Sequence, residues 1–172
     1  SGVVSEPTAL SATINPTNPT CNGDCTGQAQ AVPAGGTGPF TYAWNNGQTT
    51  QTAINLHAAT FTVTVTDFNG CTTTASQTLT DPAAVNASIN VLSNALCNGG
   101  NEGVLVASGA NGNGAPFSYL WSTGATSDTI SGLVAGTYTV TVFDVLGCTD
   151  TASATITQPT AVDASVSLDQ HV

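Results

Sequence analysis

Lysine and arginine are both absent from the 172 residues of the chain, so ten acidic side chains leave a formal net charge of −10 at pH 7. Charged residues of all kinds ordinarily occupy about a quarter of a globular sequence, so chance does not explain this absence. Without cationic side chains the chain has no means of releasing counterions from phosphates, which excludes nucleic-acid binding. Schiff-base chemistry, arginine clamps on phosphate, lysine isopeptide cross-links and trypsin cleavage sites are excluded as well.

Long apolar runs and helical periodicity are missing too. No stretch approaches the roughly 18 apolar residues that mark a transmembrane helix, so we expect no membrane insertion. The N-terminus lacks the basic and hydrophobic regions of a signal peptide, and we therefore expect the sequence to be a piece of a longer protein. Apolar residues still make up 40% of the chain, and their strand-like alternation predicts packed cores rather than disorder.

A cassette of about 75 residues occurs twice, which makes the chain modular. Each copy contains the same motifs in the same order: Cys21–Gly23, Phe40–Trp44, Phe61–Val65 and Gly70–Thr72 in copy one, and Cys97–Gly99, Phe117–Trp121, Tyr138–Val142 and Gly147–Thr149 in copy two. Similar segments also precede the copies and follow them: Pro7–Ile14, Pro82–Ile89 and Pro159–Val166. We therefore expect an incoming linker over 1–6, one domain over 7–82, a second over 83–159, and over 160–172 an outgoing strand that starts a further repeat.

Alternation within the motifs predicts strands. Phe61, Val63 and Val65 point to one side of a strand and the threonines between them to the other. The aromatic residues of each Phe-x-Tyr-x-Trp motif likewise share one face, which favours burial of Trp44 and Trp121 over a role as sugar-stacking platforms. With six or seven short strands per copy and no helical period, the sequence predicts an all-β fold of tandem Ig-like antiparallel β-sandwich domains.

The repeat also sorts the five cysteines. Cys21 and Cys97 occupy the same position 76 residues apart, and Cys71 and Cys148 do so 77 residues apart. The economical pairing is one bridge inside each copy, Cys21–Cys71 and Cys97–Cys148, and such bridges indicate export to an oxidising compartment. Cys25 has no counterpart and is predicted as an unpaired thiol. A metal or redox site formed by Cys21 and Cys25 is the rival interpretation, which copy two does not repeat.

Taken together, these motifs resemble a known family. Cys-Asn-Gly, Tyr-x-Trp, the run Gly136–Val142, Asp-x-x-Gly-Cys-Thr and the closing Gln-Pro are similar to the SprB-type repeat of giant surface adhesins from gliding bacteria that use type IX secretion. The resemblance covers nearly the whole chain, although the run Gly136–Val142 also resembles PKD and other Ig-like modules. It implies a filament at the bacterial cell surface in which the repeats act mainly as a stalk.

Two further features of the sequence concern metal binding and modification. Asp67 and Asp144 recur just before the second cysteine, where a turn-capping role is expected in preference to calcium binding. A calcium site near the prolines, using Asp81, Glu6 or Asp163, is a weaker alternative, and no other cofactor is expected. The Asp-Thr-aliphatic signals resemble the O-glycosylation acceptor of the same bacterial group, and they predict glycans at the following positions: Thr129 and Thr151.

The expected function is structural. His57 aligns with Val134 and His171 lies near the C-terminus, so neither copy repeats a catalytic constellation and no enzyme is expected. We predict a stalk segment of an extracellular adhesin, linked to gliding motility, whose partners are neighbouring repeats and surface polysaccharide or other cell-surface proteins. The alternatives are a carbohydrate-binding adhesin module and a self-assembling filament subunit that adds strands between chains.

Overall fold

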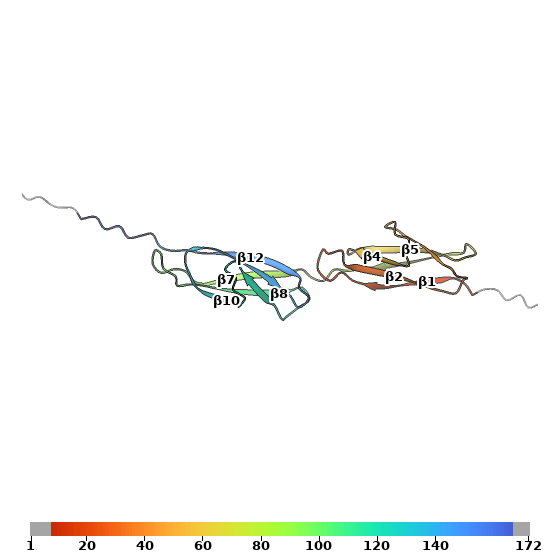
Figure 1. The fold of residues 1–172 in the computed structure, drawn as a ribbon, viewed down its shortest axis with the longest axis horizontal. Helices are drawn as coiled ribbons and strands as arrows, with labels where there is room; N and C mark the ends of the chain where they lie inside the picture. The colour runs from red at the N-terminus through yellow and green to blue at the C-terminus, as the bar shows by residue number, and fades with distance from the viewer. Residues whose placement is uncertain (1–7, 167–172) are drawn as a thin grey trace, which may run out of the picture. The chain divides into compact units, whose positions relative to one another are not determined.

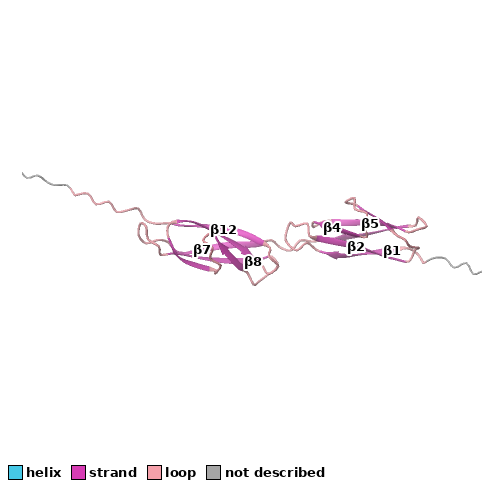
Figure 2. Ribbon diagram, viewed as in Figure 1, coloured by secondary structure: helices cyan, strands magenta, loops and turns pink. Residues whose placement is uncertain are grey.

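The computed structural model describes residues 8–166, and the chain divides into two compact units, Ser1–Ala84 and Val85–Val172. Unit 1 is red to yellow and unit 2 green to blue in Figure 1, and strands and loops alone make up the described chain in Figure 2. Over residues 8–166 there is accordingly no apolar helix of membrane-spanning length. The expected linker over 1–6 lies outside the described residues.

Unit 1 contains two three-stranded antiparallel sheets, β1-β2-β4 and β3-β5-β6. Its strands are β1 (Ser11–Thr17), β2 (Gly27–Ala34), β3 (Thr41–Trp44), β4 (Thr52–Leu56), β5 (Thr60–Thr66) and β6 (Thr72–Thr78). The inner faces of the two sheets enclose one core, with Leu56, Val63, Val65 and Leu79 almost fully buried.

Unit 2 repeats this arrangement with the sheets β7-β8-β10 and β9-β11-β12. Its strands are β7 (Val85–Ser93), β8 (Gly103–Asn111), β9 (Ser118–Trp121), β10 (Thr129–Leu133), β11 (Gly136–Phe143) and β12 (Thr149–Ile156). The predicted fold class is therefore confirmed: each unit is an Ig-like antiparallel β-sandwich, here with six strands.

The alternation of the sequence agrees with the burial of the side chains. Phe61, Val63 and Val65 on β5 are buried, as are Val140 and Val142 on β11. Each buried side chain removes apolar surface from water, and this burial is the main force that holds the two sheets together. The threonines between them lie on the outer face of the same strands, as their alternation predicted.

Both tryptophans are core residues. Trp44 is 4% exposed and Trp121 2% exposed, which confirms the prediction of burial. Each indole Nε1 donates a hydrogen bond 2.9 Å long to a backbone carbonyl, that of Thr50 in unit 1 and that of Ser127 in unit 2. The polar atom of each ring is thus satisfied inside the fold, so the rings are not available for stacking against a ligand.

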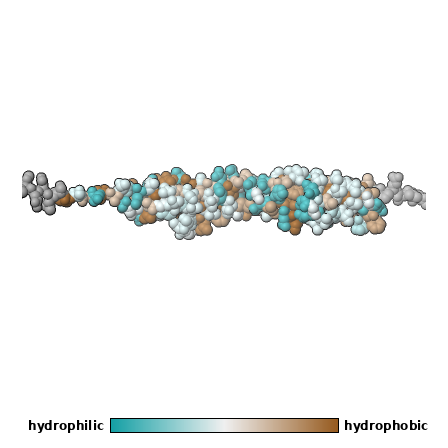
Figure 3. Space-filling model, turned by 90° about the horizontal axis from the view of Figure 1, so that it is seen from above, coloured by the Kyte–Doolittle hydropathy of each residue, from teal (hydrophilic) through white to brown (hydrophobic). Residues whose placement is uncertain are grey.

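Hydroxyl groups form a ladder on the outer face of the β5-β6 and β11-β12 pairs. Thr62 Oγ1 lies 2.7 Å from Ser76 Oγ, and Thr139 Oγ1 lies 2.8 Å from Ser153 Oγ. These cross-strand pairs add to sheet stability without charge. In Figure 3 the visible face is largely pale and teal with scattered brown residues, consistent with a surface that depends on hydroxyls rather than ion pairs for its polarity.

Tyr138 makes a hydrogen bond that its counterpart in unit 1 cannot make. Its hydroxyl donates to the carbonyl oxygen of Val134, 3.0 Å away, in the manner of the tyrosine corner of Ig domains. Phe61 occupies the equivalent position of unit 1 and packs edge to face with His57, with ring centroids 5.9 Å apart. The two repeats therefore fix the same strand by different contacts.

Tyr138→Phe is expected to lower the free energy of unfolding of unit 2 by about 0.5–1.5 kcal/mol, the usual net value of one hydrogen bond. Urea unfolding followed by fluorescence measures the change. Tyr119→Phe is the matched control, because the Tyr119 hydroxyl has no hydrogen bond among the described residues. An equal loss of stability in both variants would show that the Tyr138–Val134 bond contributes nothing particular.

The segment after unit 2 does not form the strand expected from Val162 to Leu168 over its described part. Residues 160–166 have no strand pairing, and Val162 and Val166 are 97% and 90% exposed. A single strand has no hydrogen-bonding neighbours of its own and requires a sheet to pair with. Residues 167–172 lie outside the described residues.

Candidate functional site at the two ends of each repeat

The Cys-Asn-Gly motif holds the outgoing end of its own repeat. In unit 1, Asn22 Nδ2 donates to the carbonyl oxygen of Pro82 over 3.0 Å, and the Gly23 backbone N–H donates to Asp81 Oδ2 over 2.9 Å. Nearby, the Thr80 N–H donates to Asn18 Oδ1 over 3.1 Å. We call this region, the loop 18–23 with the outgoing chain 80–82, the trailing end of unit 1.

Unit 2 has the same trailing end. Asn98 Nδ2 donates to the Pro159 carbonyl oxygen over 3.1 Å, and the Gly99 N–H donates to Gln158 Oε1 over 2.8 Å. The Thr157 N–H donates to Asn94 Oδ1 over 2.9 Å. The acceptor for the glycine is a carboxylate in one repeat and an amide in the other, so the contact requires an oxygen rather than a charge.

The opposite end of each unit is built around a buried aspartate. Asp67 is 7% exposed; its Oδ1 accepts from the backbone N–H groups of Asn69 and Cys71 at 2.9 and 2.8 Å, and its Oδ2 accepts from that of Thr37 at 3.1 Å. The Gly36 N–H donates to the Thr8 carbonyl oxygen, which fixes the incoming chain beside this loop. This region is the leading end of unit 1.

In unit 2 the leading end is centred on Asp144, which is 5% exposed. Asp144 Oδ1 accepts from the N–H groups of Leu146 and Cys148, both at 2.9 Å, while Oδ2 accepts from the backbone and side chain of Asn113 at 2.7 and 3.0 Å. A methyl group added at Gly112 would meet both Asp144 and Val85, so the start of β7 also lies here. The turn-capping role predicted for these aspartates is confirmed.

These hydrogen bonds keep both carboxyls ionised. Burial raises the pKa of Asp67, but the backbone donors of Cys71, Thr37 and Asn69 outweigh it and leave the pKa below its ordinary value. For Asp144 the backbone N–H of Asn113 has the largest effect, and with the other donors it lowers the pKa against the opposing effect of burial. Each folded leading end therefore favours the negative form of its aspartate.

A pH dependence follows from the lowered pKa values. The stabilisation from each ionised carboxylate is fully present above the unfolded pKa, about 4, and is lost as the pH falls through the lower folded pKa. We therefore expect the urea midpoint to fall as the pH drops below about 4. In Asp144→Asn the midpoint at pH 7 should be lower and the acid-side slope shallower, with the exposed Asp128→Asn as control. An unchanged slope in Asp144→Asn would contradict this assignment.

The predicted bridges inside each repeat, Cys21–Cys71 and Cys97–Cys148, are wrong. Cys21 and Cys97 lie at trailing ends and Cys71 and Cys148 at leading ends, separated by the length of a full strand. The seven residues of β6, which begins just after Cys71 and runs toward Asp81, alone extend about 23 Å. A disulfide requires Cα atoms within about 7 Å, so the two cysteines of one unit cannot pair without unfolding.

The states of the cysteines differ between the repeats. Cys21 and Cys148 are disulfide-bonded, whereas Cys25, Cys71 and Cys97 are free and exposed. The rival metal or redox site needs Cys21 as a free thiol beside Cys25, which its disulfide prevents. The single disulfide supports the expectation of an oxidising environment.

No metal centre is apparent among residues 8–166, where no three His, Cys, Asp or Glu side chains group closely enough to hold an ion. Asp81 uses Oδ2 to accept from Gly23, and Asp163 lies in the strandless segment 160–166. Glu6 and His171 lie outside the described residues, while His57 packs on the Phe61 ring. SprB-type repeats and Ig-like folds are typically non-catalytic, in agreement with this chemistry.

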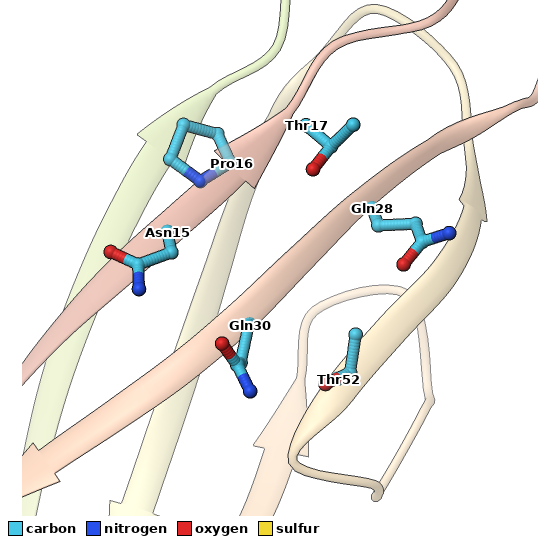
Figure 4. Close-up of a pocket in the computed structure, with 6 residues that line it drawn as sticks. All are labelled: Asn15, Pro16, Thr17, Gln28, Gln30 and Thr52. Atoms are coloured by element: carbon cyan, nitrogen blue, oxygen red, sulfur yellow. The ribbon is translucent and has the colours of Figure 1, made fainter.

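A shallow hollow lies on the outer face of the β1-β2-β4 sheet. Figure 4 shows the residues that line it: Asn15, Pro16, Thr17, Gln28, Gln30 and Thr52. Its amide and hydroxyl groups suit hydrogen bonding to a polar ligand, but no aromatic ring lines it to stack against a sugar. The predicted acceptor threonines, Thr129 and Thr151, lie elsewhere on the surface and are both exposed, on β10 and β12.

The contact between Cys-Asn-Gly and the closing proline is the functional feature that the sequence reasoning missed. The signal was present, because Asn22 precedes Pro82 by 60 residues and Asn98 precedes Pro159 by 61. A motif pair that recurs at nearly constant separation in both copies indicates a contact between its members. It had been interpreted only as the beginning and the end of the cassette.

Comparison with known proteins yields one family match and several fold similarities. The family model described as SprB repeat matches residues 13–49 and 89–126, one segment in each unit. No curated protein matches the chain. A solved structure of three N-terminal domains of the bacteriophage RB49 Highly Immunogenic Outer Capsid protein (Hoc) is similar at 19% identity with a TM-score of 0.52. The match covers 87% of this chain and 59% of that one, and it concerns the fold alone.

Similarity to Ig-domain structures is weaker. The four N-terminal Ig domains of Dscam1 isoform 1.9 show 14% identity and a TM-score of 0.35, over 91% of this chain and 48% of that one. Murine CEACAM1b shows 13% identity and a TM-score of 0.31, over 87% and 99%.

Proposed function

Because the chain is a tandem of two SprB repeats, as its motifs predicted, we propose that it is a stalk segment of an extracellular bacterial surface adhesin. The observation that carries this proposal is the repeated trailing end. Both units use an asparagine and a glycine N–H to hold the chain that leaves them. A contact that fixes the exit of every repeat serves a chain that continues into another repeat, and it serves no ligand.

The surface chemistry suits such a role. A net charge of −10 with no cationic side chain keeps copies apart and leaves no cleavage site for trypsin-like proteases. The hydroxyl ladders of β5-β6 and β11-β12 give the outer faces polarity that does not depend on ion pairs. Both properties favour a long array that is exposed to the medium outside the cell.

Gliding motility and surface attachment are the further part of the proposal. They rest on the family, whose adhesins occur on gliding bacteria, and they assign as partners the neighbouring repeats and surface polysaccharide or other cell-surface proteins. Deleting residues 7–159 from the parent protein in its source bacterium should shorten the surface filament by two repeats, measured by electron microscopy, without preventing its export. A filament of unchanged length would contradict the stalk role.

Glycans on Thr129 and Thr151 belong to the same proposal, because both hydroxyls are exposed and follow an aspartate. Cleavage before aspartate separates them into the fragments 128–143 and 150–162. Native material should show added mass on both fragments, and Thr129→Ala and Thr151→Ala should each remove it from one. Fragments of unmodified mass from the exported protein would refute the assignment.

A carbohydrate-binding module is the second candidate, which the amide-rich hollow of Figure 4 favours. Gln30→Ala with Asn15→Ala should then abolish binding to a glycan array, whereas the stalk role predicts no binding by the wild-type chain. A filament subunit that adds strands through a sheet edge would instead form polymers whose size increases with concentration in analytical ultracentrifugation.

A further inference from the structure

Each repeat carries one cysteine of the recurring pair at each end. Cys21 and Cys97 immediately precede the Asn-Gly residues that hold the outgoing chain. Cys71 and Cys148 donate their backbone N–H groups to the buried aspartate of the leading end. Every repeat therefore presents a thiol to the repeat before it and another to the repeat after it.

The two members of each equivalent pair differ in state. Cys148 is disulfide-bonded and 7% exposed, while its counterpart Cys71 is free and exposed. Cys21 is disulfide-bonded and its counterpart Cys97 is free and exposed. The bonded cysteines belong to the trailing end of the first repeat and to the leading end of the second. The free ones belong to the ends that have no neighbouring repeat in this sequence.

We propose that the disulfides of this array join consecutive repeats, from the trailing-end cysteine of one to the leading-end cysteine of the next. In this chain the rule pairs Cys21 with Cys148. Pro82, held at the trailing end of unit 1, and Val85, at the leading end of unit 2, are three residues apart, which is about 11 Å of chain at most. Covalent connection thus keeps these two ends together, whereas the two ends of one repeat are a strand length apart.

The same rule gives partners to the free thiols. Cys71 pairs with the trailing-end cysteine of a preceding repeat, and Cys97 with the leading-end cysteine of a following one. Exposed apolar side chains lie next to both: Phe68 is 71% exposed near Cys71, and Leu96 is 75% exposed beside Cys97. Apolar groups at these ends are suited to being covered by a neighbouring repeat. This part of the inference rests on the proposed function as an array, while the Cys21–Cys148 pairing does not.

The chemistry is ordinary thiol–disulfide exchange. One cysteine thiolate attacks the disulfide of a thiol oxidoreductase in the export compartment, forming a mixed disulfide and releasing one oxidoreductase thiol. The second cysteine thiolate then attacks the repeat sulfur of that mixed disulfide. An Sγ–Sγ bond forms, the two cysteines lose two protons and two electrons, and the oxidoreductase disulfide is reduced to its dithiol.

The sequence permits a direct test, since cleavage before aspartate places every cysteine in a separate fragment. The fragments are 1–23 with Cys21, 24–66 with Cys25, 67–80 with Cys71, 81–127 with Cys97, and 144–149 with Cys148. The full chain, exported into an oxidising compartment, is alkylated under denaturing conditions at acidic pH and then mapped by mass spectrometry. We expect 1–23 joined to 144–149, and its loss on reduction.

Other maps would overturn the pairing. Fragment 1–23 joined to 67–80, or 81–127 joined to 144–149, would restore bridges within repeats, and five alkylated thiols would show that no bridge forms. Cys21→Ser should release Cys148 for alkylation, while the matched control Cys25→Ser should leave the linked pair intact. Circular dichroism of both variants distinguishes a lost bridge from a lost fold.

The flanking thiols have their own test, which fails separately from the first. Concentrated chain under oxidising conditions should form head-to-tail multimers on a non-reducing gel, because the Cys97 of one copy can pair with the Cys71 of another. The multimers should contain fragment 67–80 joined to 81–127, and Cys71→Ser should abolish them. Multimers linked through Cys25, or no multimers at all, would overturn this part and leave the Cys21–Cys148 result standing.

Discussion

Trp121→Ala is expected to lower the free energy of unfolding of unit 2 by about 3–5 kcal/mol, the usual loss for removing a buried aromatic side chain. Trp121 is 2% exposed and lies opposite Val140 in the β9–β11 pairing. Its truncation opens a cavity between the sheets and deprives the Ser127 carbonyl of its donor. Because small domains have total stabilities of about 5–15 kcal/mol, unit 2 should lose a large part of its stability.

Leu120→Ala is the matched control for this prediction. Leu120 precedes Trp121 on β9 but faces outward and is 46% exposed, so its truncation should change stability by about 0.5 kcal/mol or less. Differential scanning calorimetry measures both variants without depending on tryptophan fluorescence. Similar small losses in the two variants would contradict the placement of Trp121 in the core.

Gly35→Ala is the second prediction with a large effect. Gly35 has φ +69°, and a methyl group added there would overlap the carbonyl oxygen of Ala9 in the incoming chain. The left-handed backbone costs an L-residue about 1–2 kcal/mol, and the overlap adds about 1–3 kcal/mol. We expect unit 1 to lose about 2–5 kcal/mol in urea unfolding followed by Trp44 fluorescence.

Gly47→Ala separates the two contributions. Gly47 has φ +86° but no atom within 4 Å of the added methyl group, so only the backbone cost of about 1–2 kcal/mol should be seen. The difference between the two variants measures how firmly the incoming chain is docked at the leading end. If both variants lost the same stability, Ala9 would not be held against Gly35.

The fold was predictable because alternation has a direct physical meaning. A side chain such as Val63 or Val140 must lie on one face of its strand, and the apolar face must be buried. The hairpin glycines before the second cysteine, Gly70 and Gly147, have the positive φ that tight turns need, as expected. Local rules of this kind depend on neighbouring residues, which a single sequence contains.

The cysteine pairing was not obtained from the same rules, since equivalence between copies does not say at which end a residue lies. Cys21 follows the first strand and Cys71 precedes the last one, so each is a strand length away from the chain end that it adjoins. Following the strands in this way would have placed them apart. The contact of Asn22 with Pro82 was harder to predict, because it joins residues 60 positions apart.

Strands β1 and β6 each run between the two ends of unit 1, with Cys21 after β1 and Cys71 before β6. With a bridge at each end, tension would pass through a repeat along β6 from Cys71, or along β1 to Cys21. Both routes are already extended at about 3.3 Å per residue, so melting the sandwich would release almost no slack. An array bridged in this way would behave as an inextensible double cable, which softens when its repeats unfold but does not lengthen.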